Sequence, residues 1–82
     1  MARYYFDLRK GDRVFLDDEG IELSTIEAVQ QEAVRTVAEM ARDAIRGNPN
    51  GPGHLLAIEV RDDNEPVLQV RFHWTVERHK QS

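Results

Sequence analysis

The stretch STIEAVQQEAVRTVAEMARDAIR, residues 24–46, decides the fold of this chain. Its apolar residues recur at steps of three and four, which is the pattern of a helix with one face on a core and the other in water. At about 1.5 Å per residue such a helix is about 33 Å long, enough to cross a small sheet. The apolar positions are Ile26, Val29, Ala33, Val34, Val37, Ala38, Met40, Ala41, Ala44 and Ile45.

Both ends of this predicted helix carry signals. Ser24 with Glu27 three residues later forms a capping box, in which each side chain accepts from the other residue's backbone N–H. Gly47 follows the last periodic residue, where a left-handed conformation suits glycine. Pro49 then prevents the helix from continuing.

Alternating segments on both sides of the helix predict two β-hairpins. Residues 3–9 and 13–17 form the first hairpin around Gly11, and residues 54–61 and 67–78 form the second around a polar turn. The loop of residues 48–53 is rich in proline and glycine.

The order ββαββ predicts an α+β fold, a two-layer sandwich with one helix on a four-stranded antiparallel sheet of order 2-1-3-4. Residues 1–82 form one domain, with 79–82 expected to be frayed. The predicted inner face carries Tyr4, Phe6, Leu8, Val14, Leu16, Leu56, Ile58, Val60, Leu68, Val70, Phe72 and Trp74. The other face has no second layer.

The composition excludes several classes of protein. The chain has no cysteine, which rules out disulfides, thiolate metal sites and thiol catalysis. No run is long and apolar enough for a membrane span, so we expect a cytoplasmic protein. The net charge is −4, and residues 18–46 hold seven acids against three arginines, which disfavours a non-specific nucleic-acid binder.

Two groups of residues have side chains of the kind that bind metals or take part in catalysis. The acidic run Asp17, Asp18, Glu19 with Glu22 has hard oxygen ligands for a cation, but acids also favour a helix N-terminus without metal, and the run lacks EF-hand spacing. The histidines His54, His73 and His79 stand at no motif spacing. We therefore predict no metal, no cofactor and no enzymatic activity.

The outer sheet face is the predicted interaction surface. It combines more apolar residues than a solvated face needs with a few basic ones, and the long fourth strand lies at an edge. We predict a module that self-associates as a homodimer or binds a protein partner through this face or edge. The alternative is a regulator that binds nucleic acid through the basic residues. The surface residues are Tyr5, Arg9, Phe15, Leu55, Ala57, Arg71 and His73.

The residues RYYFDLR (3–9) and DDEGIEL (17–23), followed by an alanine-rich helix, resemble a family of small bacterial proteins of unknown function. That family opens with an R-Y-F-F-H-x-R-like strand and carries a D-x-E-G-x-E-L segment. The resemblance covers mainly residues 3–45 and implies a stand-alone cytoplasmic domain, with no activity or cofactor. Asp7 departs from the pattern, which has histidine there. The element order also resembles small antitoxin-type regulators, a likeness of fold only.

Overall fold

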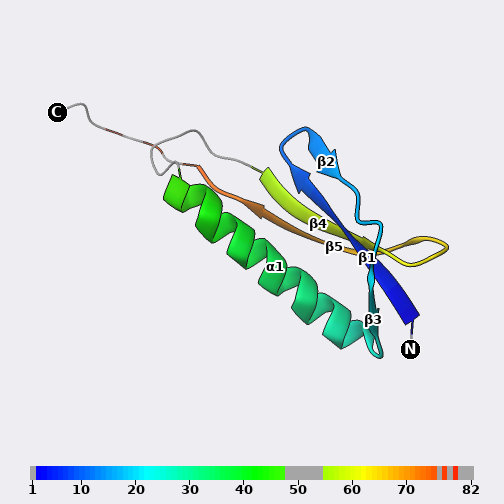
Figure 1. Ribbon diagram of the computed structural model, residues 1–82. Helices are drawn as coiled ribbons and strands as arrows, with labels where there is room; N and C mark the ends of the chain where they lie inside the picture. The colour runs from blue at the N-terminus through cyan, green and yellow to red at the C-terminus, as the bar shows by residue number, and fades with distance from the viewer. Residues whose placement is uncertain (1, 48–54, 76, 78, 80–82) are drawn as a thin grey trace.

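The computed structural model describes residues 2–47, 55–75, 77 and 79, and this part of the chain forms one helix packed on an antiparallel sheet (Figure 1). Its elements are β1 (Ala2–Lys10), β2 (Arg13–Phe15), β3 (Ile21–Leu23), α1 (Ile26–Gly47), β4 (Leu55–Arg61) and β5 (Pro66–His73). The strand order is β2-β1-β4-β5, and every pairing is antiparallel. The predicted α+β fold and sheet order are confirmed.

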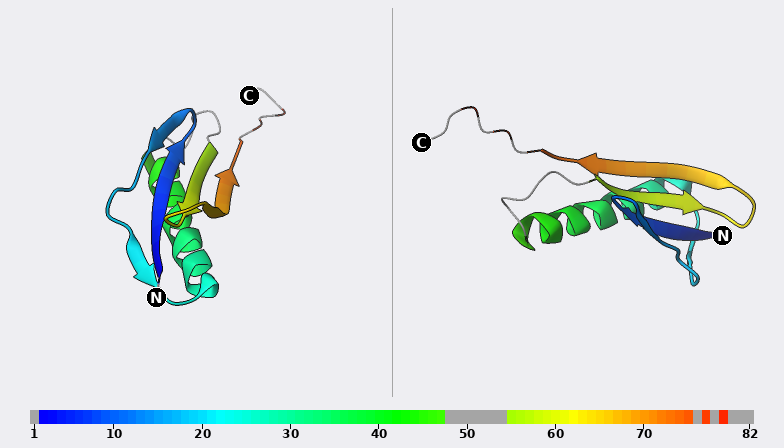
Figure 2. Two further views of the ribbon diagram at one scale, coloured as in Figure 1. Left: turned by 90° about the vertical axis from the view of Figure 1, so that its right-hand side faces the viewer. Right: turned by 90° about the horizontal axis from the view of Figure 1, so that it is seen from above.

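The short strand β3 was not predicted. It pairs with the first part of β1, where Ala2 lies opposite Leu23, whereas β2 pairs with the last part, where Leu8 lies opposite Phe15. Both therefore follow the same edge of β1, one after the other (Figure 2). A strand of three residues is too short to show a period of two, so its sequence reads as a lead-in to the helix.

The helix begins one residue later than its capping box predicted. The hydroxyl of Thr25 accepts a hydrogen bond from the Ala28 N–H at 3.1 Å, so Thr25 and not Ser24 is the N-cap. The predicted left-handed conformation of Gly47 is also wrong, because Gly47 belongs to the helix and its φ is not positive. The predicted boundaries were therefore displaced by one or two residues, while the helix itself is confirmed.

The core lies between α1 and the middle of the sheet. Val29 and Ala33 of the helix have no exposed surface, and Ile58 and Val60 of β4 are 2% and 1% exposed. The surrounding half-buried residues are Tyr4, Phe6, Leu8, Leu23, Met40, Leu68, Val70 and Phe72. The core thus draws residues from every strand except β2.

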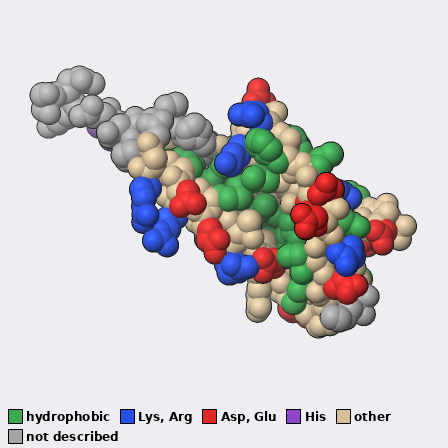
Figure 3. All heavy atoms as spheres, in the orientation of Figure 1, with side chains coloured by type: hydrophobic (Ala, Val, Ile, Leu, Met, Phe, Trp, Pro, Cys, Tyr) green, Lys and Arg blue, Asp and Glu red, His purple; other side chains and the backbone are tan. Residues whose placement is uncertain are grey.

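The prediction that β2 contributes to the core is wrong. Val14 is 44% exposed and lies opposite Arg9 on the outer face, and Leu16 is 73% exposed. Phe15 lies opposite Leu8 on the helix side, where it is still 43% exposed. One helix is about 10 Å wide, so it covers about two strands at their spacing of about 4.8 Å. The helix packs on β4, β5 and β3, which leaves the β2 side of the inner face open. Figure 3 shows hydrophobic side chains gathered between α1 and this side of the sheet.

The second hairpin is shorter than predicted. Its last strand ends at His73, and Trp74 and Thr75 are not part of the sheet. The Trp74 and Phe72 rings have centroids 5.5 Å apart, as expected for an aromatic pair on one face. Val76, Arg78, His54, the loop of residues 48–53 and the tail 80–82 lie outside the described residues, so the predictions made for them stay open.

Candidate functional site

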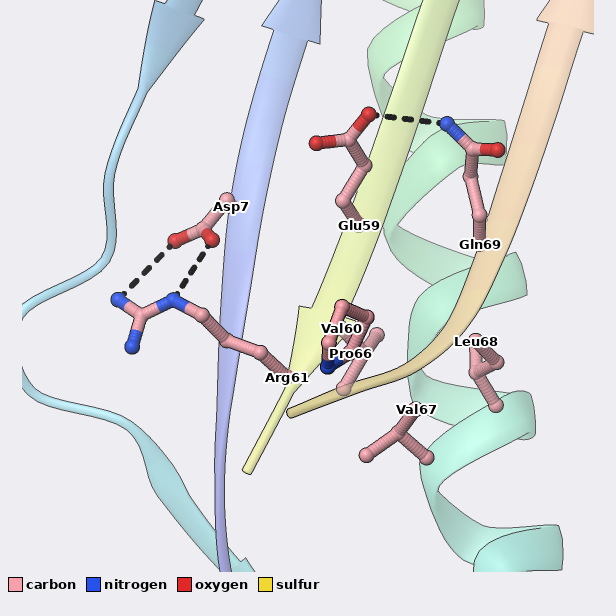
Figure 4. A pocket seen from close by; sticks show the side chains of 8 residues that line it. All are labelled: Asp7, Glu59, Val60, Arg61, Pro66, Val67, Leu68 and Gln69. Carbon is pink, nitrogen blue, oxygen red and sulfur yellow. Dashed lines mark hydrogen bonds and ion pairs between the residues drawn. The ribbon is translucent and has the colours of Figure 1, made fainter. Parts of the chain in front are cut away.

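The outer face of the sheet carries a buried carboxylate, Asp7, which is 6% exposed. Its Oδ2 accepts a hydrogen bond from Nε of Arg61 at 2.8 Å, and its Oδ1 accepts the backbone N–H of Asp17 at 2.9 Å. The two side chains come from neighbouring strands and point toward one another (Figure 4). A buried carboxylate needs such partners, because its charge is costly to remove from water.

Arg61 connects this carboxylate to two other elements. Its Nη2 donates to the backbone carbonyl of Asp17 at 3.0 Å, and its guanidinium lies 4.6 Å from the centre of the Tyr5 ring. The hydrogen bond to Asp7 is the main cause that raises the pKa of Arg61, and the cost of desolvation opposes it. The guanidinium is therefore fixed in place, with one face against an aromatic ring.

Asp17 organises the segment that connects β2 to β3. Its Oδ2 accepts the backbone N–H of Phe6 at 3.1 Å, and its Oδ1 accepts the N–H groups of Glu19 and Gly20 at 3.0 and 3.2 Å. Partial burial alone would raise the pKa of Asp17, but these hydrogen bonds and the charge of Arg61 outweigh it and lower the pKa. The carboxylate thus serves as an acceptor for three backbone amides.

Gly20 lets this segment approach β1 closely. Its φ is +74°, and a Cβ there would lie 2.9 Å from Cγ of Arg3 and 3.0 Å from both the Tyr4 carbonyl oxygen and Cε1 of Tyr5. An L-residue would meet both a backbone penalty and a steric one. The D-x-E-G segment is therefore a structural connection. Asp17 accepts hydrogen bonds from backbone N–H groups, and Gly20 allows the close approach to β1.

The acidic residues of this segment do not converge on one point. Asp18 and Glu19 are exposed, while Glu22 lies 3.8 Å from the guanidinium of Arg3. Within the described residues, no three His, Asp or Glu side chains are grouped so that they can hold a metal ion. The histidines are also separate, since His73 and His79 are exposed at different places and His54 lies outside the described part.

A second group of polar side chains lies on the outer face beside Asp7 and Arg61. Glu59 Oε2 accepts from Nε of Arg9 at 3.2 Å and from Nε2 of Gln69 at 2.9 Å. Together with Asp7 and Arg61, these strands line an open depression of about 500 Å³ (Figure 4). The charged groups there already pair with each other, so the depression presents few free polar atoms to a ligand.

The structure separates the predicted interaction residues into distinct groups. Tyr5 lies against Arg61, Arg9 is ion-paired with Glu59, and Ala57 is 0% exposed. Ala57 lies between Arg9 and Arg71 in the register, and both have longer side chains. With no exposed surface, Ala57 cannot take part in a surface contact.

The remaining predicted residues lie at opposite edges of the sheet. Phe15 is 43% exposed on β2, with the guanidinium of Arg13 5.3 Å from its ring centre. Its position opposite Leu8 puts it on the helix side of the sheet, so its predicted place on the outer face is wrong. Arg71 and His73 are exposed on β5 and line a shallow depression with Leu55. The predicted surface is thus not continuous.

The exposure of several apolar residues on the helix was not predicted. Val34 is 48% exposed and Ile45 is 37% exposed, and Ala38 between them is exposed too. The helical period assigned all three to the apolar stripe that faces the core. The sequence does contain a signal for this exposure. The apolar stripe of the helix is wider than the surface that the sheet can cover, so residues at its margin remain exposed.

The fold and these surfaces define a small α+β domain with one helix and an open-edged sheet. A family model described as a domain of unknown function, DUF6894, matches residues 3–73, so the chain belongs to this family. The match confirms the resemblance read from residues 3–45 and extends it through both hairpins. No curated protein and no solved structure shows significant similarity. Within the described residues no helix is both long enough and apolar enough to span a membrane.

Proposed function

We propose that this domain is a non-enzymatic interaction module that self-associates through the open edge of β5. The observation that carries the proposal is that β5 has eight residues and, within the described chain, pairs only with β4. Such an edge presents unpaired backbone N–H and C=O groups to a second chain. Beyond its first residue, Pro66, β5 contains no proline and no lysine, the residues that commonly protect an edge.

The outer face supports a contact less well than this edge. Its ionic groups, Asp7 with Arg61 and Arg9 with Glu59, are already paired inside the domain. A partner that covered them would remove these pairs from water without supplying new ones, and desolvation of an ion pair costs energy. This is why the proposal takes the edge rather than the face.

The opposite edge of the sheet is a weaker candidate for strand pairing. β2 is only three residues long, and short edge strands are one way in which proteins limit pairing. Its exposed side chains, Val14 and Phe15, offer apolar surface, but the strand presents few backbone groups. We therefore place the contact at β5.

Sedimentation velocity of the full chain at micromolar concentration tests the proposal. We expect a species of twice the 9.5 kDa chain mass, with a dimer fraction that rises with concentration. Because strand pairing and apolar contact are not ionic, added salt should change the dimer fraction little. A monomer at every concentration would refute the proposal.

Nucleic-acid binding is the alternative, and it has less support. Of the basic residues on which it rested, Arg9 is neutralised by Glu59, which leaves Arg71 and His73 on the β5 side. Binding through phosphates falls steeply with salt, so a filter-binding titration with single-stranded RNA at low and high salt distinguishes this activity.

A further inference from the structure

The exposed apolar flank of α1, formed by Val34, Ala38 and Ile45, lies on the β5 side of the helix. The other flank of α1, with Met40, Asp43 and Ala44, lines a depression together with the turn that joins β1 to β2. At 100° per residue Val34 and Ala38 lie on the side of the helix away from that turn, which is the side of β5. The open edge of β5 and the apolar flank of α1 therefore lie on the same side of the molecule.

The spacing of strands fits a second copy at this edge. The helix packs on β4 and β5 (Figure 2), and strands lie about 4.8 Å apart. If the sheet continues across β5 into a symmetry-related copy, the two helices lie over the two β4–β5 pairs, and their axes are about 10 Å apart. Packed helices have axes about 8–10 Å apart, so the same two-fold axis that pairs the strands also brings the helix flanks into contact.

We propose that two copies pair antiparallel along β5, with Val70 opposite Val70 of the partner subunit, and that α1 packs on the partner's α1 through Val34 and Ala38. The result is one continuous sheet with both helices on the same face. This inference rests on the proposed self-association and specifies its geometry.

The register follows from the side chains of β5. Only registers centred on a residue keep the inner and outer faces matched across the pair, because side chains alternate. A centre at Arg71 places two like charges opposite each other, which is destabilising. A centre at Gln69 brings Pro66 into the paired segment, where it has no N–H to donate. A centre at Val70 avoids both and places Gln69 opposite Arg71 of the partner subunit. It also pairs all of residues 67–73, whereas a centre at Phe72 pairs only residues 71–73 of β5.

Single cysteines test the register, because the chain has none of its own. In the Val70→Cys variant the two Cα atoms lie about 5 Å apart across the pair, within the range of a disulfide. In the Arg71→Cys variant they lie roughly 8 Å apart, too far for a bridge. Under mild oxidation we expect a covalent dimer from Val70→Cys and a roughly tenfold lower yield from Arg71→Cys.

Two arginine variants test the helix contact independently of any disulfide. Val34 and Val14 are the same residue type with nearly equal exposure, 48% and 44%, on opposite sides of the molecule. We expect Val34→Arg to weaken the dimer by roughly tenfold or more, because it places a charge in the helix contact, and Val14→Arg to leave the dimer unchanged.

The outcomes separate the two proposals. A dimer that persists in Val34→Arg, dissociates in Val14→Arg and is cross-linked poorly by Val70→Cys would place the interface at β2 and overturn this inference while the self-association stands. A wild-type chain that stays monomeric overturns both. If Val70→Cys does not fold, Val34→Arg and Val14→Arg still decide the matter, since both residues are exposed in the monomer.

Discussion

Substitution of Asp7 by asparagine tests the network on the outer face. The carboxylate accepts from Arg61 through one oxygen and from the Asp17 N–H through the other. An asparagine keeps one acceptor oxygen and turns an N–H₂ donor toward one of these donors, so one hydrogen bond is lost and the guanidinium loses its counter-charge.

A hydrogen bond to a charged group contributes about 1.5–3 kcal/mol to stability. Because the Arg61 side chain is 39% exposed and can be rehydrated, we expect Asp7→Asn to lower the free energy of unfolding by about 2 kcal/mol, near the lower part of that range. For a domain of this size that corresponds to a fall in Tm of roughly 10 °C.

Urea denaturation followed by circular dichroism measures this loss. Asp12→Asn is the matched control, because Asp12 is exposed in the turn between β1 and β2, and such surface changes stay within about 0.5 kcal/mol. If Asp7→Asn is as stable as Asp12→Asn, the network does not stabilise the fold and the reasoning fails.

Two further predictions concern the segment from Asp17 to Gly20. Gly20→Ala should lower the free energy of unfolding by about 3 kcal/mol, since it combines a positive φ with overpacking against β1. Gly11→Ala, also at positive φ but with nothing within 4 Å, should cost only about 1 kcal/mol, and equal losses would contradict the close approach. The lowered pKa of Asp17 means that its contribution is complete above the ordinary value of 3.8 and is lost as the pH falls through the lower folded-state pKa. Urea midpoints measured from neutral to acidic pH should therefore fall less steeply in Asp17→Asn than in the wild type, and identical profiles would refute this.

The sheet order could be predicted from the sequence, because the alternating segments indicate two hairpins and the capped periodic segment indicates one helix between them. The partners of Asp7 were not. Alternation assigns Asp7, Glu59 and Arg61 to the same face, but only the register, with Tyr5 opposite Arg61 and Asp7 opposite Glu59, decides which charges meet. Register depends on the packing of the whole sheet, which a local pattern does not contain.

The width of the helix explains why the core was overestimated. A period of two predicts that Val14 and Leu16 face inward, but the register places Val14 opposite Arg9 on the outer face. Phe15, which lies opposite Leu8, is the β2 residue on the helix side, and it is 43% exposed. The helix packs on β4, β5 and β3, however, so inward-facing at β2 does not mean buried. Alternation predicts only that successive residues face opposite sides of a sheet. The register decides which side each one faces, and burial depends on where the covering layer ends.

The edge of β5 is a better candidate for an interaction surface than the outer face of the sheet. On the face, Arg61 covers the ring of Tyr5, and Ala57 is enclosed, so the apolar surplus expected there is largely used inside the domain. The exposed large apolar residues of the described chain lie on or beside β2 and β3 at one edge of the sheet, at the start of the helix, and on the helix flank beside β5. Among the described strands, only β5 adds a long row of unpaired backbone groups to the apolar residues beside it. Because a second copy satisfies the strand and the helix flank about one two-fold axis, self-association accounts for both features with a single contact.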